Sequence, residues 1–494
     1  MQPWPNHPTA RRFAFPAVVA LCSLLVGARP AAAAAPDNNV EWPGLSHLGF
    51  QDRRPLCPVG GETFQVRLQA LKNDLTAVRV RVDTGVVTFV NASVVGARGP
   101  YDIWAAQVPA SPAGSTINYL FEVTDGADVD YYSVSGASDL LPADGGFVVN
   151  FANLSHAPVG ATLVNNGAGA VFKVWAPTRT SALARGTFNS WGTGNPLTKV
   201  GEYFIGRVNT ATDLAYYKFF FNNAVWNSDP RARSLDPTNS YNARIENPFR
   251  YNWQVPDFAT PALDRMVVYQ LHVGTFSGRN DPVGNPAHPG RFVDVAARVD
   301  HLVELGVNAV MVMPVCEFPT DLSAGYNPIT AWAPEWRYGT PDEFKQMVDT
   351  LHQHGIAVLV DIVWNHLSPT DNYLWNYDGT QTYFDNPVVD TPWGSQAAFG
   401  VNEVRDYYVN SALTWLEEYK VDGFRMDATA YMDQGAHATT GYSLMQRFND
   451  ALDNRWADKV TIAEELPNDP YITRPTSLGG AGFDAQYHQK FRDN

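Results

Sequence analysis

The stretch Val421-Asp422-Gly423-Phe424-Arg425-Met426-Asp427-Ala428 has the pattern of a short buried strand, yet it carries charge. Residues i and i+2 of a strand point to the same face, so Arg425 and Asp427 project together from an apolar segment. Burying a charge is costly unless it is paired, which indicates that these two side chains form a pair with a purpose. An aspartate kept ionised by a neighbouring arginine is a candidate nucleophile.

A second apolar strand, Thr461-Ile462-Ala463-Glu464-Glu465, also ends in carboxylates. Asp427 and these glutamates would then stand at the ends of nearby strands. Two carboxyl groups in this arrangement are what the cleavage of a glycosidic bond requires. The two strand ends are therefore candidates for a catalytic pair of carboxyl groups, with Glu464 and Glu465 both open as the partner of Asp427.

The sequence around these strands alternates between apolar runs and segments with helical spacing. The apolar runs cover residues 267–273, 307–314, 356–363, 421–427 and 460–463, and the helical segments cover residues 292–305, 342–354, 404–419 and 442–456. Buried parallel strands joined by crossover helices indicate an α/β sheet or barrel over residues 259–494.

Two earlier parts of the chain, residues 36–153 and 154–258, show short strands and turns instead. Apolar and polar residues alternate in several short runs, such as residues 64–68 and 78–82. This spacing predicts two β-sandwich modules ahead of the α/β part. Three aromatic residues of the second module are expected to lie in its core: Trp175, Phe188 and Trp191.

The composition excludes some partners. Among 494 residues there are 35 basic and 50 acidic side chains, a net charge of −15, which disfavours nucleic acid. The 14 Trp, 22 Tyr and 26 Phe offer flat rings for sugars, although most are expected to be core. Cys57 and Cys316 lie far apart in the sequence, so no disulfide framework is expected.

Residues 1–35 are typical of a secretion signal. Arg11 and Arg12 precede an apolar run at residues 13–26, and small residues follow at 31–35. The apolar run is too short for a comfortable membrane span. The mature protein is therefore expected to be secreted or periplasmic, with no membrane attachment after cleavage.

Four blocks of the α/β part resemble the α-amylase family, glycoside hydrolase family 13, whose retaining enzymes use a (β/α)8 (TIM) barrel. The blocks lie at residues 306–314, 361–366, 422–428 and 463–465, in the family's order and each at a strand end. Active sites of such barrels lie at the C-terminal ends of the strands. The second β module, with Gly186-Thr187-Phe188-Asn189-Ser190-Trp191, resembles the carbohydrate-binding family 48 type of immunoglobulin-like module.

The resemblance implies a role for each residue of the pair and its neighbours. Asp427 would be the nucleophile, and Glu464 would be the general acid and then the general base. Arg425 would orient Asp427, and Asp361 would orient Arg425. Glu464 is favoured over Glu465 because the family places the acid directly after a small residue, which leaves Glu465 as a supporting partner. The acid must stay protonated near neutral pH, as a like charge or partial burial achieves.

The resemblance also implies substrate contacts. His366 would hydrogen-bond a sugar hydroxyl, and Tyr326 would stack on the reacting sugar. Asn365 occupies a position that binds calcium in true α-amylases, but branching-type relatives often lack this ion, so no metal or other cofactor is predicted. The expected partner is an α-glucan: starch, glycogen or maltooligosaccharides.

The connection at residues 367–402 is long, and long loops in compact domains are usually functional. It is expected to form the acceptor side of the cleft with six aromatic residues: Tyr373, Trp375, Tyr377, Tyr383, Phe384 and Trp393. The amino-acid sequence at residues 371–375 and 391–394 resembles that of branching enzymes and maltooligosyl-trehalose trehalohydrolases.

Three functions therefore remain open. The first, favoured because the chain looks exported, is retaining hydrolysis of α-1,4-glucosidic bonds through a covalent glycosyl-enzyme. The second is transfer by a 1,4-α-glucan branching enzyme or another transglycosidase, or the action of a trehalohydrolase. The third is an inactive glucan-binding fragment, although the presence of both Asp427 and Glu464 counts against it.

The family needs a third carboxylate, an Asp that follows a His on the seventh strand. It is expected beyond residues 482–487, because His488 and Asp493 are not in a matching context. Five strands are clear and a sixth is expected near residues 483–487, whereas a complete barrel has eight. The sequence therefore predicts a barrel that is incomplete at the C-terminus and has little activity by itself.

Overall fold

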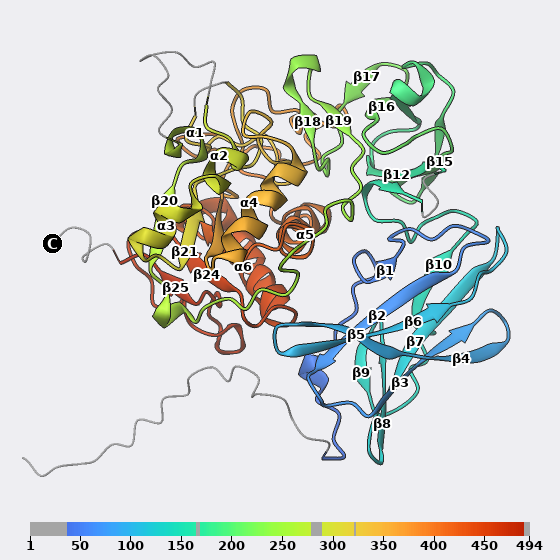
Figure 1. Ribbon diagram of the computed structural model, residues 1–494. Coiled ribbons are helices and arrows are strands. Elements are labelled where there is room, and N and C mark those ends of the chain that lie inside the picture. The colour runs from blue at the N-terminus through green and yellow to red at the C-terminus, as the bar shows by residue number, and fades with distance from the viewer. Residues whose placement is uncertain (1–36, 165–167, 278–288, 321–322, 489–494) are drawn as a thin grey trace, which may run out of the picture.

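The computed structural model describes residues 37–164, 168–277, 289–320 and 323–488. Two β modules lie beside one α/β part (Figure 1). The secretion signal predicted at residues 1–35 lies outside the described residues.

The N-terminal module consists of two antiparallel sheets around one core. The sheets have the strand orders β1-β2-β6-β5 and β4-β3-β7-β8-β9, and β10 also pairs with β7. Alternate residues of each strand point inward, so Val66 and Leu68 meet Val80 and Val82 in this core. The strands are β1 (Arg53–Arg54), β2 (Phe64–Leu71), β3 (Ala77–Asp83), β4 (Val87–Asn91), β5 (Ser93–Arg98), β6 (Tyr101–Val108), β7 (Thr116–Asp125), β8 (Asp128–Ser133), β9 (Gly136–Ser138) and β10 (Phe147–Asn150).

The second module is one connected antiparallel sheet in the order β11-β12-β15-β14-β13-β16-β19-β18, with β17 on β16. Trp175 is buried in its core as expected, and Phe188 packs against the core, but Trp191 is only half-buried and contacts the exposed ring of Trp226. The strands are β11 (Gly160–Leu163), β12 (Ala170–Trp175), β13 (Ala182–Gly186), β14 (Pro196–Val200), β15 (Tyr203–Val208), β16 (Tyr216–Phe221), β17 (Val225–Asn227), β18 (Leu235–Asp236) and β19 (Asn242–Arg244). The immunoglobulin-like character of both modules remains a prediction.

The α/β part contains a six-stranded parallel sheet in sequence order. Its strands are β20 (Val268–Leu271), β21 (Ala309–Val312), β22 (Ala357–Ile362), β23 (Gly423–Met426), β24 (Val460–Ala463) and β25 (Ala485–Gln486). Every residue of β21 to β24 is buried, as expected for strands covered on both faces. The strands match the five apolar runs and the sixth strand that the sequence predicts, and they form part of a barrel.

Helices connect these strands: α1 (Val273–Phe276), α2 (Phe292–Ala296), α3 (Val299–Leu305), α4 (Pro341–Gln353), α5 (Asn402–Tyr419) and α6 (Ala438–Asp453). The predicted helix at residues 292–305 is in fact two, α2 and α3, although no proline or glycine separates them. Gly306 ends α3 in the left-handed conformation, with a φ of 77°, which glycine adopts without strain.

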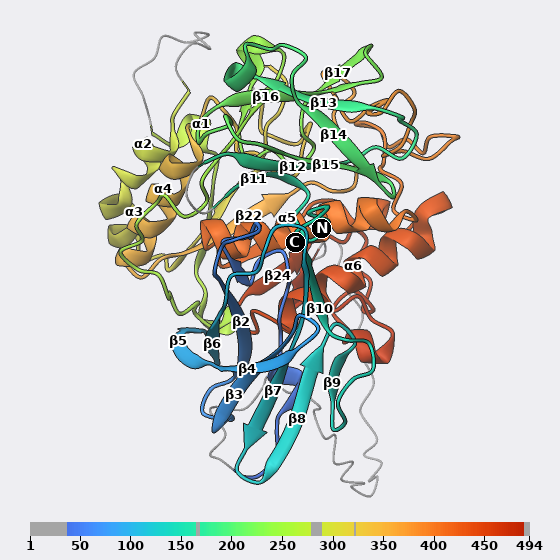
Figure 2. The ribbon, with the colours of Figure 1, turned by 90° about the vertical axis from the view of Figure 1, so that its right-hand side faces the viewer.

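Helix α5 is the element against which both β modules dock, and Figure 2 shows it running between them. Arg231 and Arg233 of the second module pair with Glu403 and Glu418 of α5. Glu417 of α5 pairs with two arginines of the N-terminal module, Arg54 and Arg98. Acidic residues on one helix therefore fix both modules to the α/β part.

A further ion pair joins the N-terminal module to the loop after α6. Arg455 donates to Asp52 over 2.6 Å, and both side chains are almost completely buried. Asp52 also accepts from the backbone N–H of Leu48, and Arg455 donates to Ser46. Such a pair is costly to break, because the remaining charge stays buried without compensation.

Two sequence expectations concern the chain as a whole. Cys57 and Cys316 are free, buried thiols and form no disulfide with each other. Burial raises the pKa of each thiol to about 12. None of the described helices is long and apolar enough to cross a membrane.

We predict that Arg455→Met lowers the free energy of unfolding by about 3–5 kcal/mol, because it strands the buried carboxylate of Asp52. The matched control is Arg81→Met, whose partner Asp83 is partly exposed in the same module, where a change below about 1 kcal/mol is expected. Urea denaturation of both variants checks this. If both variants lost the same free energy of unfolding, burial of the Arg455 pair would not increase its contribution to stability.

Candidate active site

The two predicted carboxylates follow neighbouring parallel strands. Asp427 comes directly after β23 and Glu464 directly after β24. Backbone hydrogen bonds continue past the strand ends: the N–H of Asp427 donates to Ile362, and the N–H of Glu464 donates to Met426, both over 2.9 Å. Parallel pairing therefore brings the two residues to one edge of the sheet, at its C-terminal side.

Arg425 connects the carboxylates of three strands. Its Nη1 atom donates to Asp361 over 2.6 Å and to Asp427 over 2.8 Å, and its Nη2 atom lies 2.7 Å from Glu464. The guanidinium is nearly inaccessible to solvent, so these charge-assisted bonds are strong. The predicted contacts of Arg425 with Asp361 and Asp427 are present, and the contact with Glu464 was not anticipated.

Glu464 has the environment of a general acid. Its side chain is partly exposed and lines a pocket, and its Oε2 atom accepts the backbone N–H of Ala428 over 3.0 Å. Partial burial raises the pKa of Glu464, and the nearby carboxylate of Asp427 raises it further, against the opposing effect of Arg425.

Glu465 points away from Arg425, as the alternation of a strand requires. Its carboxylate is buried and accepts the hydroxyl of Thr429 over 2.7 Å. Burial raises the pKa of Glu465 to about 7, and Asp433 and Asp469 add to this. Glu464 is therefore the glutamate that faces the pocket, and Glu465 supports the segment after the nucleophile position.

Ala428 adopts the left-handed conformation, with a φ of 42°. This conformation is uncommon for a residue with a Cβ and costs free energy, so it persists only where surrounding contacts hold it. Here the N–H of Ala428 meets Glu464, and the N–H of Thr429 meets the backbone oxygen of Glu464. The strained residue thus links the two strand ends.

Tyr326 lies close to the arginine and lines the same pocket as the two carboxylates, and its stacking on a sugar stays a prediction. Its hydroxyl donates to Asp361 over 2.7 Å, and its ring centre lies 5.7 Å from the guanidinium of Arg425. Burial raises the pKa of Asp361 to about 7, against the opposing charge of Arg425. Tyr487 lies over Arg425, with its ring centre 5.4 Å from the guanidinium. The sequence places Tyr487 in the expected sixth strand but does not predict this contact.

His366 and Asn365 form a chain of contacts to the nucleophile position. Asn365 donates from Nδ2 to a carboxylate oxygen of Asp427 over 2.9 Å, and its Oδ1 atom lies 2.6 Å from Nδ1 of His366. Nε2 of His366 lies 2.9 Å from the backbone oxygen of Tyr326. Burial lowers the pKa of His366, and the neutral ring carries one N–H, so a sugar hydroxyl would compete with these contacts.

The carboxylates open into a pocket of about 480 Å³. It is lined by Tyr326, His366, Trp393, Arg425, Asp427, Ala428, Ala430, Tyr431, Glu464 and Leu466. Asp427 and Glu464 are the carboxylates in this lining, so the third carboxylate that the family requires is not among the described lining residues. No group of three or more metal-ligating side chains was found in the described residues, and the amide of Asn365 is bonded to Asp427.

An aromatic pair forms one side of the pocket. Trp393 and Tyr431 are both exposed and meet edge to face, with ring centres 4.9 Å apart. Tyr431 belongs to a 3-10 helix, η5 (Thr429–Tyr431), and the sequence analysis did not select it. Its position four residues after Asp427 was the available signal.

Part of the long loop at residues 367–402 packs against the second β module, which the sequence did not predict. Trp393 is the member of its six aromatic residues that lines the pocket. Tyr377 and Tyr383 are buried against the second β module, where their rings contact Phe221 and Trp175. Thr178 of that module donates to Asp378 over 2.6 Å. Part of the loop therefore holds the module in place.

A parallel barrel sheet with a nucleophile candidate, an acid with a raised pKa and an aromatic pocket side is typical of retaining glycosidases and transglycosidases. Comparisons with known proteins agree. Residues 280–393 match the family model for the alpha amylase catalytic domain. This part of the chain is thus similar to the α-amylase family, glycoside hydrolase family 13, which confirms the resemblance seen in the sequence.

Individual relatives give more detail. A 1,4-alpha-glucan branching enzyme GlgB from Photobacterium profundum is 30% identical over 371 residues, covering 66% of this chain and 51% of that protein. One from Picrophilus torridus is 31% identical over 342 residues, covering 64% and 48%. The chain thus spans about half the length of the curated relatives it matches.

Solved structures show the same fold. A Salmonella typhimurium protein described as an alpha amylase is 28% identical, with a TM-score of 0.56 over 66% of this chain and 53% of that one. A pullulanase from Anoxybacillus sp., complexed with maltotriose, has a TM-score of 0.56 over 88% of this chain and 66% of its own, at 18% identity, which shows likeness of fold alone.

We predict that Glu465→Gln makes unfolding less dependent on pH. A carboxyl whose pKa is about 7 when folded and near 4.5 when unfolded binds its proton more tightly in the folded state. Its contribution to stability is therefore present below pH 4.5 and is lost as pH rises to 7, by at most about 1.4 kcal/mol per pH unit. The amide of Glu465→Gln does not titrate and so lacks this loss. The free energy of unfolding of the variant should therefore rise relative to that of wild type as pH approaches 7.

Urea denaturation between pH 4.5 and 8 measures this difference. Glu304→Gln, at an exposed position of α3, is the control and should follow the wild-type curve. Parallel curves for wild type and Glu465→Gln would contradict the prediction.

Proposed function

We propose that the protein is a retaining enzyme that cleaves α-1,4-glucosidic bonds through a covalent glycosyl-enzyme. One observation carries this proposal: the guanidinium of Arg425 contacts both carboxyl groups. Its nitrogens lie 2.8 Å from an oxygen of Asp427 and 2.7 Å from an oxygen of Glu464. Two carboxyl groups held this closely suit the retaining separation of about 5–5.5 Å better than the inverting separation of about 6.5–9.5 Å.

In the first step, a carboxylate oxygen of Asp427 attacks the anomeric carbon and forms an ester bond. The glycosidic bond breaks, and its oxygen takes the proton of Glu464. Arg425 and Asn365 each hold one oxygen of Asp427, which fixes the direction of attack. Arg425 also places its positive charge 2.8 Å from the attacking carboxylate.

In the second step, Glu464 works in the opposite direction. Ester formation removes the negative charge of Asp427, which is one of the causes of the raised pKa of Glu464. The glutamate therefore becomes more acidic and remains ionised until it takes a proton from the incoming hydroxyl group. That hydroxyl attacks the anomeric carbon and releases Asp427, with retention of configuration.

The favoured acceptor in the second step is a hydroxyl group of another glucan chain. The branching enzymes at 30% and 31% identity support this choice, and the rings of Trp393 and Tyr431 offer a surface for an acceptor sugar. Hydrolysis is the second candidate, supported by the 28% identity to the Salmonella typhimurium protein described as an alpha amylase. In that case water is the acceptor.

The second β module is proposed to be an immunoglobulin-like, family 48-type module that binds glucan. Its half-buried Trp191 and exposed Trp226 form an aromatic surface, and the guanidinium of Arg185 lies 4.9 Å from the ring of Trp226. Export of the protein remains part of the proposal, on the basis of the signal-like residues 1–35.

We predict that Glu464→Gln reduces kcat on maltooligosaccharides by about 10²–10⁴-fold, because the leaving oxygen receives no proton. An α-glucosyl fluoride needs no such proton, so its attack by Asp427 should continue and accumulate an ester detectable by intact mass spectrometry. Asp427→Asn should form no ester with either substrate. An ester that persists in Asp427→Asn would disprove the assigned nucleophile.

We also predict that Trp393→Ala lowers the ratio of transfer to hydrolysis several-fold, because the acceptor sugar loses a ring surface worth about 1 kcal/mol. Product analysis with maltoheptaose measures the ratio. Trp375→Ala is the control, since this exposed tryptophan of the same loop packs on Phe384 outside the pocket. An unchanged ratio in Trp393→Ala would exclude the ring from acceptor binding.

A further inference from the structure

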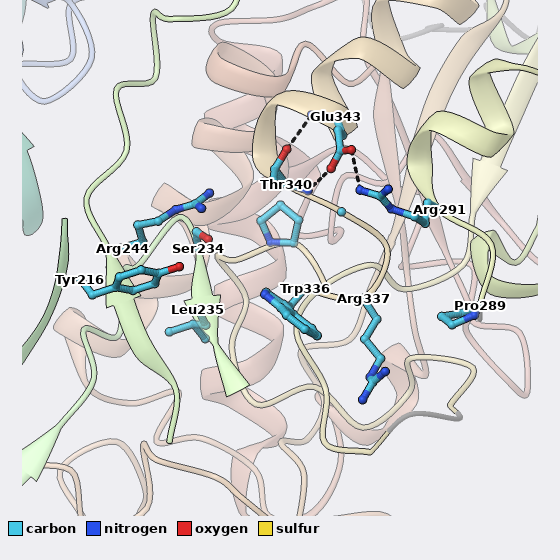
Figure 3. Close-up of a pocket in the computed structure, with 12 residues that line it drawn as sticks. Tyr216, Ser234, Leu235, Arg244, Pro289, Arg291, Trp336, Arg337, Thr340 and Glu343 are labelled. Carbon is cyan, nitrogen blue, oxygen red and sulfur yellow. Dashed lines mark hydrogen bonds and ion pairs between the residues drawn. The ribbon is translucent and has the colours of Figure 1, made fainter. Parts of the chain in front are cut away.

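A second pocket, of about 430 Å³, lies at the seam between the second β module and the α/β part (Figure 3). Strands β16, β18 and β19 of the module form one side of it, and the segment leading into α4 forms the other. It is lined by Tyr216, Ser234, Leu235, Arg244, Pro289, Arg291, Pro334, Trp336, Arg337, Gly339, Thr340 and Glu343. It shares no lining residue with the pocket around Asp427.

The apolar surface of this pocket is aromatic. Trp336 is 41% exposed although it lies at a hollow, and the guanidinium of Arg337 lies 5.8 Å from its ring centre. Figure 3 shows the rings of Tyr216 and Trp336 on either side of Leu235. A single exposed tryptophan is unremarkable, but an exposed ring inside a concave site with convergent polar groups is the usual form of a ligand site.

Two of the three arginines that line the pocket have carboxylate partners. Arg291 lies 2.6 Å from Glu343, and Arg244 lies 2.6 Å from Glu246. The other oxygen of Glu343 accepts the backbone N–H of Thr340 over 2.7 Å, so the carboxylate is fixed in place. Because these arginines already have carboxylate partners, the site suits a neutral ligand with many hydroxyl groups better than an anion.

We propose that this pocket binds a segment of an α-glucan chain, with a sugar face on Trp336 and hydroxyl groups on the fixed arginine and glutamate side chains. The inference rests on the proposed function for its ligand class. One loop, which follows β21, supplies both Tyr326 of the catalytic pocket and Trp336 of this one, ten residues further along. A chain bound at Trp336 is thus held on the side of the barrel where cleavage occurs.

Binding of maltoheptaose to the full chain, measured by titration calorimetry in an Asp427→Asn background that prevents turnover, tests the proposal. Trp336→Ala should weaken the binding at one of the sites by about tenfold, or about 1.4 kcal/mol. Trp336→Phe keeps a flat ring and should recover most of the affinity. Phe89→Ala is the control, because this ring of the N-terminal module is similarly exposed, at 47%, and also lies beneath an arginine.

The outcomes separate this proposal from the proposed function. If the parent binds maltoheptaose and Trp336→Ala binds it equally, the pocket proposal fails while the catalytic assignment stands. Absence of glucan binding by the parent and of turnover by the wild type would overturn both. Loss of binding in Trp336→Ala with an unchanged melting temperature, and no displacement by inorganic phosphate, supports a neutral glucan site; displacement by phosphate would overturn it.

Discussion

The charge of Arg425 is the constraint on which the site depends. A buried guanidinium requires partners, and here three carboxylates from three consecutive strands supply them. Each contact requires its strand end to stay at the same level of the sheet, so the ion cluster and the parallel register stabilise each other. The cluster also sets the chemistry, because the same positive charge acts on the nucleophile and on the acid.

Ion pairs between arginines and carboxylates also join the β modules to this barrel part. Helix α5 pairs with arginines of both modules, and the buried pair of Asp52 and Arg455 adds a further contact. The loop at residues 367–402 connects the two regions, since it places Trp393 in the catalytic pocket and buries Tyr377 and Tyr383 against the second module. Domain docking and the shape of the cleft therefore involve the same segment.

Much of the site was predictable because strands impose a simple geometry. The alternation of side chains along β23 places Arg425 and Asp427 on one face, and the same alternation separates Glu464 from Glu465. The strands and most helices follow from apolar periodicity. The break between α2 and α3 was not predictable, because no residue there disfavours a helix. Trp191 was expected in the core but lies half-buried at the surface beside Trp226, since burial depends on neighbouring strands that periodicity does not identify.

The sequence by itself determined the candidate nucleophile, because Arg425 and Asp427 share one face of a strand. It also determined the parallel α/β architecture, because apolar runs alternate with helical segments, and its resemblance to a known family selected Glu464 as the candidate acid. The tertiary structure decided the rest. The contact of Arg425 with Glu464, the cover of Tyr487 over Arg425 and the pairing of Trp393 with Tyr431 all join residues of different segments. Such contacts depend on how loops and strands pack in space. The spacing of residues along the chain shows the periodicity of one segment, but it does not show which segments pack together.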